Sequence, residues 1–216
     1  MSNSSLVVYT SMSPNHSGAR TMSIDRITPH CTAGPCDIRQ LGNLFLKSST
    51  AASANYGVDR NGQIGLFVPE DFRSWCSSSA ANDQRAVTIE CSSTEFDPYE
   101  MTAETYKALT ELCVDICRRH GKTRLIWKPD RAAAEAYTPG PEEILLTVHR
   151  WYAAKACPGE WLYSRLPQLA DTVTVRLQSQ TIYRVQLGAF RDRKNAEKFL
   201  SEVQKNGYPD AFISTR

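Results

Sequence analysis

The stretch His149-Arg-Trp-Tyr-Ala-Ala-Lys-Ala-Cys-Pro-Gly159 places an imidazole, an amine and a thiol in one short segment. Another histidine, His30, lies far upstream in Ile27-Thr-Pro-His-Cys-Thr-Ala-Gly34. Two imidazoles and one thiolate are enough for a tetrahedral zinc site that keeps one position open for water or substrate. The sequence therefore predicts one Zn²⁺ held by His30, His149 and Cys157.

Each of these ligands also has a simpler explanation when it is taken alone. A single histidine on an apolar strand, such as His30, is usually a packed core residue that hydrogen-bonds to its neighbours. Cys157 differs because it comes just before a predicted helix start at Gly159, where the positive end of the helix favours the thiolate.

The seven cysteines are an odd number in a long chain, which argues against a secreted disulfide scaffold. A bridge between Cys31 and Cys36 on oxidation stays open.

Composition limits the class of protein. The 216 residues suffice for one well-buried domain of about 150–180 residues and a small appendage. A net charge of +2 with 22% charged residues argues against a nucleic-acid partner. No apolar stretch approaches the roughly 18 residues that span a membrane, so no membrane insertion is expected. The N-terminus lacks the pattern of a secretory signal, which predicts synthesis in a host cytoplasm without a signal peptide.

Strands and helices are predicted to alternate, which indicates an α/β domain ending near residue 177. Residues 1–23 are polar and turn-rich and are expected to form an extended lead-in. The Asn61-Gly62 pair predicts a hairpin, and Pro29 is unexpected in its strand because proline donates no ladder hydrogen bond. The predicted strands are 24–30, 57–68 (as a hairpin), 86–91 and 125–127, and the predicted helices are 38–46, 102–120 and 159–177.

The segments that hold the three metal ligands resemble type 2 N-acetylmuramoyl-L-alanine amidases, zinc enzymes related to peptidoglycan recognition proteins that include many phage endolysins. The motif Lys155-Ala-Cys157-Pro-Gly159 is similar to the family's ligand loop, and the likeness covers about residues 20–175. Cys31 stands where the family often has a second histidine. The resemblance implies a central mixed β-sheet flanked by helices, with a zinc cleft. It also implies peptidoglycan as the partner and action on the cell wall after the enzyme is released through a holin.

The resemblance also implies catalytic roles. Glu90 closes an apolar strand, where a carboxylate is costly without a partner or a role, and it matches the family's general base. Lys155 matches a residue that stabilises the oxyanion, and Tyr56 matches a tyrosine that lies near the zinc in relatives. The alternatives are a surface glutamate at a strand end, a solvated loop lysine and an ordinary buried tyrosine.

Substrate contacts are expected from the segment 73–83, which resembles a Trp-His-Ala-Gly loop in relatives. Trp75 offers a flat apolar face and one donor to sugar or peptide, although it also suits a cleft wall. Asn82 is a candidate polar contact. Cys76 occupies the place of the family's histidine.

After a short polar linker at 178–181, a strand (182–190), a helix (195–206) and a strand (211–214) predict a small C-terminal βαβ segment. Tyr183-Arg-Val-Gln-Leu-Gly-Ala-Phe190 resembles the first strand of a SPOR domain, which implies that 182–216 is a partial wall-binding module. Arg184 and Gln186 share a strand face with Phe190 and are its candidate glycan contacts. A segment this small buries little core alone, so it docks on the first domain, pairs with a second chain as a homodimer, or is an incomplete copy.

The leading interpretation is therefore a zinc hydrolase that cleaves the amide between the muramic acid lactyl group and L-Ala, and so lyses bacteria. The alternative is a non-catalytic peptidoglycan recognition module, although relatives of that kind commonly lack the cysteine ligand. A structural zinc in an interaction protein would need a fourth protein ligand, and the sequence offers no obvious one.

Overall fold

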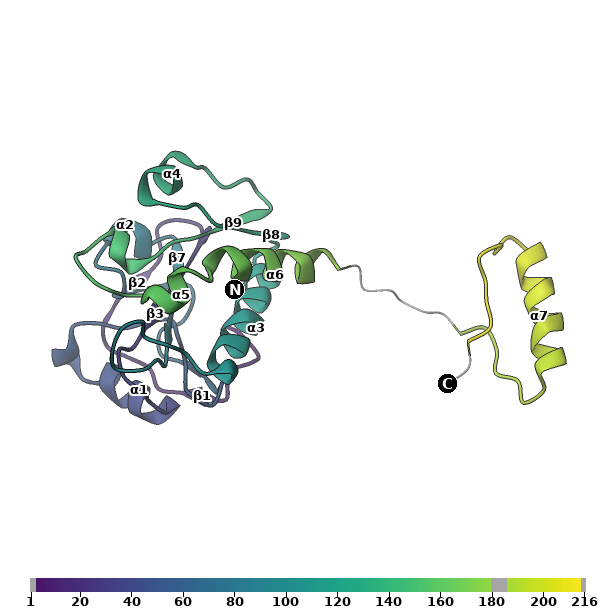
Figure 1. The fold of residues 1–216 in the computed structure, drawn as a ribbon, viewed down its shortest axis with the longest axis horizontal. Helices are drawn as coiled ribbons and strands as arrows, with labels where there is room; N and C mark the ends of the chain where they lie inside the picture. The colour runs from purple at the N-terminus through teal and green to yellow at the C-terminus, as the bar shows by residue number, and fades with distance from the viewer. Residues whose placement is uncertain (1–2, 180–185, 215–216) are drawn as a thin grey trace. The chain divides into compact units, whose positions relative to one another are not determined.

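The structure is a computed structural model that describes residues 3–179 and 186–214. The chain divides into two compact units, Met1–Ser179 and Gln180–Arg216, each described here by itself (Figure 1). All seven cysteines are free thiols. No helix in the described part of the chain combines the length and the apolar character that crossing a membrane requires.

The first unit is built on a seven-stranded mixed sheet of order β1-β5-β4-β7-β3-β9-β8. All neighbouring strands are parallel except β4 and β5, which form the predicted hairpin. The strands are β1 (Tyr9–Thr10), β3 (Arg26–Cys31), β4 (Tyr56–Val58), β5 (Ile64–Leu66), β7 (Ala86–Cys91), β8 (Arg124–Ile126) and β9 (Glu143–Leu146). A second sheet pairs β2 (His16–Ala19) with β6 (Phe72–Ser74).

Helices flank this sheet, which confirms the predicted α/β class. Asp37 caps α1 through the main-chain N–H groups of Arg39 and Gln40, as its sequence position predicts. Helices α3 and α6 pack against each other. The helices of the unit are α1 (Ile38–Leu46), α2 (Ala80–Asp83), α3 (Ala103–Arg119), α4 (Arg131–Ala136), α5 (Glu160–Tyr163) and α6 (Leu166–Gln178), with 3₁₀ turns η1 (Ser48–Thr50) and η2 (His149–Trp151).

Pro29 lies on the central strand β3 without breaking it. The Thr147 N–H donates to the Ile27 carbonyl, so Ile27 and Pro29 turn their main-chain groups towards β9. Strand β9 ends at Leu146, and the donor that Pro29 lacks would face the side where this neighbour has ended. A proline is tolerated there because no ladder hydrogen bond is lost.

The predicted helix 159–177 is wrong in one respect. The structure splits it into α5 and α6, with the break at Ser164 and Arg165. Pro167 lies in the first turn of α6, where its missing N–H costs nothing, whereas within a longer helix it would remove a hydrogen bond.

The second unit contains the predicted helix, α7 (Arg193–Lys205), which Asp192 caps. In the described parts of the two predicted flanking strands, residues 186–190 and 211–214, there is no strand pairing, and 182–185 lie outside the described residues. None of the described residues of this unit is buried. Strands need a partner for their main-chain groups and a face to bury, and this short segment supplies neither, so the predicted βαβ arrangement is not observed.

Candidate metal centre

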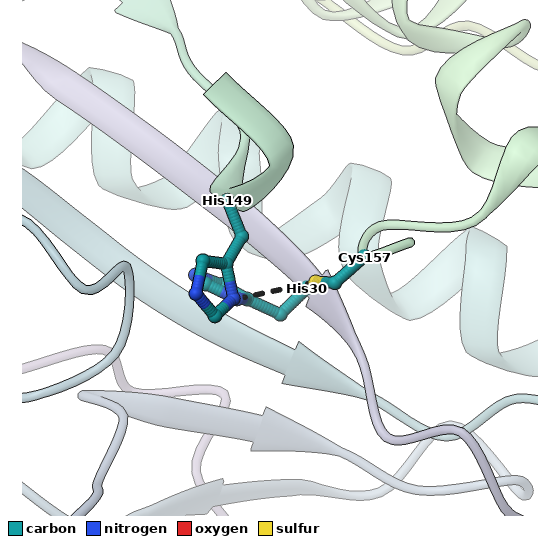
Figure 2. Close-up of side chains that lie close together, drawn as sticks. All are labelled: His30, His149 and Cys157. Atoms are coloured by element: carbon teal, nitrogen blue, oxygen red, sulfur yellow. Dashed lines mark hydrogen bonds between the residues drawn. The ribbon is translucent and has the colours of Figure 1, made fainter. Parts of the chain in front are cut away.

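The three predicted ligands converge at the carboxyl ends of neighbouring strands. His30 is near the end of β3, His149 opens η2 directly after β9, and Cys157 precedes α5 (Figure 2). The His30 Nδ1 atom is 3.3 Å from the Cys157 Sγ atom, and the two imidazole centroids are 5.1 Å apart. One ligand atom from each residue lies within 4.8 Å of the others. The structure thus brings together residues that are distant in the sequence.

This donor set fits zinc. Tetrahedral bonds of ordinary length place a thiolate sulfur and an imidazole nitrogen about 3.6 Å apart, and the observed separation is 3.3 Å. Burial is the main cause that lowers the pKa of His30 to about 3, and the electrostatic effect of His149 lowers it further. Burial, followed by Lys155, lowers the pKa of His149 as well. Both imidazoles are therefore neutral near pH 7, the form that binds a metal.

The Cys157 thiol receives one main-chain hydrogen bond, from the Cys31 N–H at 3.5 Å. Its hydrogen bond with the Cys31 side chain, together with burial, raises the pKa of the Cys157 thiol when no cation is present. A bound metal opposes this shift because the thiolate is the form that coordinates.

Gly159 allows the sharp turn from Cys157 into α5. Its φ is +83°, and an added Cβ would lie 2.8 Å from the Pro98 carbonyl oxygen.

Glu90 lies beside the ligands without joining them. It pairs with His30 across β3 and β7, and its Oε1 atom is 4.0 Å from the His30 Nδ1 atom. Nitrogen and oxygen ligands of one tetrahedral zinc are about 3.4 Å apart, and at 4.0 Å the Glu90 Oε1 atom is farther than that from His30 Nδ1. His30, Cys76 and Glu90 nevertheless form a second group with ligand atoms within 4.8 Å of one another. Its Oε2 atom is buried and has no hydrogen-bond partner among the described residues. This geometry suits a base that takes a proton from water at the centre.

Burial is also the main influence on the charge of Glu90. Burial, followed by the charge of Cys31, raises the pKa of Glu90 to about 8, and a hydrogen bond from Cys76 opposes the shift. A divalent cation at the neighbouring ligands would lower this pKa and favour the carboxylate. A carboxyl group with a raised pKa is suited to exchanging protons near neutral pH.

Lys155 lies on the exposed loop between His149 and Cys157. After burial, its positive charge is the second cause of the lowered pKa of His149. The predicted role of Lys155 as a cation beside the metal ligands stays a prediction.

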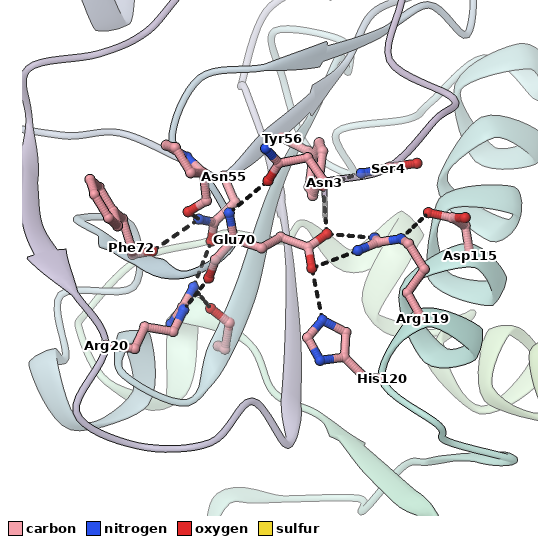
Figure 3. A network of polar contacts seen from close by, with 12 residues as sticks. Asn3, Ser4, Arg20, Asn55, Tyr56, Glu70, Phe72, Asp115, Arg119 and His120 are labelled. Atoms are coloured by element: carbon pink, nitrogen blue, oxygen red, sulfur yellow. Dashed lines mark hydrogen bonds and ion pairs between the residues drawn. The ribbon is translucent and has the colours of Figure 1, made fainter. Parts of the chain in front are cut away.

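Tyr56 is not at this centre, and its predicted catalytic role is wrong. It pairs with Ile89 rather than Glu90, so its side chain points to the opposite face of the sheet. The Tyr56 hydroxyl is fully buried, donates to the Glu70 Oε1 atom at 2.5 Å and accepts from the Ser4 N–H at 2.9 Å (Figure 3). The phenol therefore belongs to a structural network.

Glu70 is the centre of that network (Figure 3). It is 0% exposed, and Arg119 donates to its two oxygens at 2.5 and 2.9 Å while His120 lies 2.8 Å away. Burial alone would raise the pKa of Glu70, but hydrogen bonds from His120, Arg119 and Tyr56 outweigh it and lower the pKa to about 2. The network ties the end of α3 to the N-terminal segment, whose Asn3 side chain accepts from the Glu70 N–H.

Asn82 does not contact substrate, which corrects the second prediction in this region. Its side chain is 1% exposed. Its amide nitrogen donates to Thr28 and Ser77, and its oxygen accepts from Arg26, Thr147 and Tyr152. Every hydrogen-bonding position of this amide is used inside the fold.

The remaining predicted contacts are exposed or lie elsewhere. Trp75 is 37% exposed, and its indole N–H donates to the Ser17 hydroxyl at 2.7 Å. Gln186 is exposed and donates to the Gly188 carbonyl. Arg184 lies outside the described residues.

Two residues near the centre were not predicted. The Ser78 hydroxyl is 2.9 Å from the His149 Nε2 atom. The Cys76 thiol is 3.7 Å from the Glu90 Oε1 atom. A serine in a run of three serines carries no local signal of this contact, whereas Cys76 was noted only for its place in the loop.

Comparisons with known proteins agree with this fold. A family model described as N-acetylmuramoyl-L-alanine amidase matches residues 20–160, and a SPOR domain model matches residues 160–215. The SPOR match overlaps α5 and α6, which the structure places in the first unit. No protein of curated function matches the chain by sequence.

Solved structures share the fold at low identity. A mutant endolysin from Bacillus subtilis has a TM-score of 0.56 at 16% identity, with 80% of this chain and 99% of that chain covered. The Staphylococcus aureus hydrolase AmiA, in complex with its ligand, has a TM-score of 0.59 at 16% identity (81% and 87% covered). Drosophila peptidoglycan recognition protein SD has a TM-score of 0.52 at 21% identity (73% and 88% covered). Because the amidase model spans well over half of the sequence, this chain belongs to the N-acetylmuramoyl-L-alanine amidase family and carries a SPOR-like C-terminus.

Proposed function

We propose that this protein is a zinc-dependent amidase that hydrolyses the bond between the muramic acid lactyl group and the L-Ala amino group of peptidoglycan. The observation that carries the proposal is the cluster of His30, His149 and Cys157 with Glu90 4.0 Å from the His30 Nδ1 atom. The result in the cell is lysis, and the enzyme reaches the wall after it is released through a holin.

The residues of the centre have separate tasks in this reaction. Bound at His30, His149 and Cys157, Zn²⁺ supplies a Lewis acid and lowers the pKa of water. Glu90 takes the proton of the attacking water and returns it to the leaving amino group of L-Ala. Lys155, on the exposed loop between His149 and Cys157, stabilises the negative charge that develops on the carbonyl oxygen.

The substrate is a glycan-linked stem peptide. Trp75 is half-exposed on the strand-to-loop segment that precedes Cys76, and its indole presents an apolar face to sugar or peptide. The second unit contributes affinity for the wall, with Gln186 exposed at its start and Arg184 as a further candidate contact.

A recognition module without catalysis is the second candidate, and the fold similarity to a peptidoglycan recognition protein is compatible with it. The presence of Cys157 and of a buried carboxylate beside the ligands favours the enzyme, because mere recognition needs neither.

The decisive experiment is mass spectrometry of the products released from purified peptidoglycan, with and without a zinc chelator. An amidase releases free stem peptides with an L-Ala amino terminus and leaves the glycan chains intact. Chelation should stop this release, and added zinc should restore it. Bound but uncut peptidoglycan would favour the recognition module, and new reducing sugar ends would mean that another bond is cleaved.

Replacing Cys157 with serine is expected to lower zinc affinity by more than about 100-fold and to abolish lysis. The reason is that the loss of an outer partner alone costs about 10- to 100-fold, and Cys157 is a direct ligand. Mass spectrometry would measure the zinc content and circular dichroism the folded state, so that metal loss is separated from unfolding. Cys36→Ser is the matched control, since Cys36 is a half-buried free thiol outside the ligand set. A purified Cys157→Ser protein that keeps its zinc and its activity would refute the site.

Removal of residues 180–216 is expected to weaken binding to cell walls while hydrolysis of soluble muramoyl peptides stays unchanged. The metal ligands and the described core all belong to the first unit. Sedimentation with insoluble walls measures the first effect, and initial rates measure the second. Equal wall binding by both chains would argue against the wall-binding role.

The same segment is our candidate homodimer surface, because Leu187, Phe190 and Phe212 are exposed.

A further inference from the structure

A short loop, Cys76–Ser79, reaches both functional parts of the metal centre. The Cys76 thiol is 3.7 Å from the Glu90 Oε1 atom, which is a sulfur-to-oxygen hydrogen bond. Two residues later, the Ser78 hydroxyl is 2.9 Å from the His149 Nε2 atom. One loop therefore contacts the candidate base and one metal ligand through two residues that lie two positions apart.

Asp83 holds this loop in place. Its carboxylate is 2% exposed and accepts hydrogen bonds from the Cys76 N–H, the Ser77 N–H and the Ser77 hydroxyl, the last at 2.6 Å. The Ser79 hydroxyl accepts from the Asn82 N–H and so caps α2, the helix that carries Asp83. A buried carboxylate with three donors fixes the main chain on which Cys76 and Ser78 stand.

The backbone at Ser78 is in an unfavourable conformation. Its φ is +59°, in the left-handed region that residues with a side chain rarely adopt. Such strain persists only when the surroundings hold it. Here it accompanies the hydroxyl contact with His149, while the residue itself is exposed and has no core to fill.

The contact with the His149 Nε2 atom decides which nitrogen is left for a metal. A histidine ligand usually donates its other ring N–H to a fixed partner, which sets the tautomer and the ring orientation. In the tautomer that donates its Nε2–H to the Ser78 hydroxyl, the Nδ1 atom carries the free lone pair and is the atom left for a metal. His30 also presents its Nδ1 atom to Cys157, so both imidazoles would bind through the same nitrogen.

We propose that the 76–79 loop is a positioning element of the metal centre: Ser78 fixes the ring of His149, and Cys76 holds the Glu90 carboxylate in place. Asp83 fixes the main chain of the loop through its hydrogen bonds to Cys76 and Ser77, so that both contacts can form at the same time. The proposal rests on the proposed function, since it assigns the loop to the ligands and the base of that reaction.

The contact with His149 is tested by zinc affinity, measured by competition with a chromophoric chelator. Ser78→Ala is expected to weaken zinc binding by about 10- to 100-fold. Ser78→Gly removes the same hydroxyl but relieves the left-handed backbone, so an equal loss in both variants assigns the effect to the hydroxyl. Ser48→Ala is the matched control, because Ser48 is an exposed serine of η1 outside the 76–79 loop and its hydroxyl should not affect zinc affinity. A Ser78→Ala affinity within twofold of wild type would overturn this part.

The contact with Glu90 is tested by the separation of kcat from KM on a soluble muramoyl peptide. Cys76→Ala is expected to lower kcat by about tenfold, at the lower end for an outer partner, with KM unchanged. Cys76→Ser keeps a donor of similar size and should restore most of the rate. Equal rates in Cys76→Ala and wild type, or no rescue by serine, would overturn this part.

These measurements also distinguish failure of the loop proposal from failure of the proposed function. A wild-type protein that binds zinc but cuts no peptidoglycan refutes the amidase, while the comparison of Ser78→Ala with Ser48→Ala still decides the positioning of His149. A wild-type protein that binds no zinc overturns both proposals. Normal amidase activity with unchanged zinc affinity in Ser78→Ala overturns the loop's role at His149 alone.

Discussion

A Glu90→Gln variant is expected to keep its zinc and to lose about 10²- to 10⁴-fold in kcat, the range that a positioned proton acceptor contributes. Glutamine preserves the shape of the side chain and can still accept the hydrogen bond from Cys76. It cannot take a proton from water. The ligands His30, His149 and Cys157 are untouched, so metal binding should stay close to that of wild type.

Initial rates on a soluble muramoyl peptide, taken together with zinc content, test this expectation. Glu104→Gln is the matched control, because Glu104 is an exposed glutamate in the first turn of α3. A Glu90→Gln protein whose kcat is within threefold of wild type would remove Glu90 from the mechanism. Loss of zinc along with activity would instead make Glu90 a ligand.

A Glu70→Gln variant is expected to lower the free energy of unfolding by about 3 kcal/mol or more near pH 7. Removal of one partner from a buried ion pair typically costs about 3–5 kcal/mol, because the other charge stays in the interior. Here Arg119 and His120 both face Glu70, which is 0% exposed. Glu111→Gln is the control: the Glu111–Arg176 pair is 39% exposed on both sides, and such surface pairs contribute about 0–1 kcal/mol.

The same network predicts a pH dependence of stability. The pKa of Glu70 is about 2 in the folded protein against an ordinary value of 4.5. Its contribution, on the order of 3 kcal/mol, is therefore complete above about pH 4.5 and is lost as the pH falls towards 2. Denaturant unfolding at pH 7, 4.5 and 3 should show the gap between wild type and Glu70→Gln closing on acidification. A gap that stays constant with pH would contradict this account.

Much of the fold follows from local patterns in the sequence. The strands 86–91 and 24–30, the Asp59–Gly62 turn, and the helices at 38–46 and 102–120 have strong periodicity and caps, and the structure contains each of them. The split of 159–177 was missed because Pro167 suits either the first turn of a new helix or a kink. The described parts of the predicted C-terminal strands, 186–190 and 211–214, are unpaired, because strand pairing depends on partners that local pattern does not specify.

The candidate site was predictable where a motif fixed the role. His30, His149 and Cys157 lie together, with Glu90 beside them. Tyr56 and Asn82 were misplaced because sequence position does not say which face of the sheet a residue takes, or whether its amide is already satisfied. A shift of one position along β4 moves a side chain to the other face, and this separates the Tyr56 phenol from the metal ligands.

His30 and Cys157 are separated by 127 positions in the chain. They meet only after β3 has paired with β7 and β9, and such long-range parallel pairings form slowly. In the unfolded chain His149 and Cys157 stay close in sequence, but the complete set of three ligands is not preassembled, since closing the long loop to His30 is entropically unfavourable. Zinc should therefore enter a sheet that has already folded, slowing unfolding while leaving the rate of refolding nearly independent of zinc concentration.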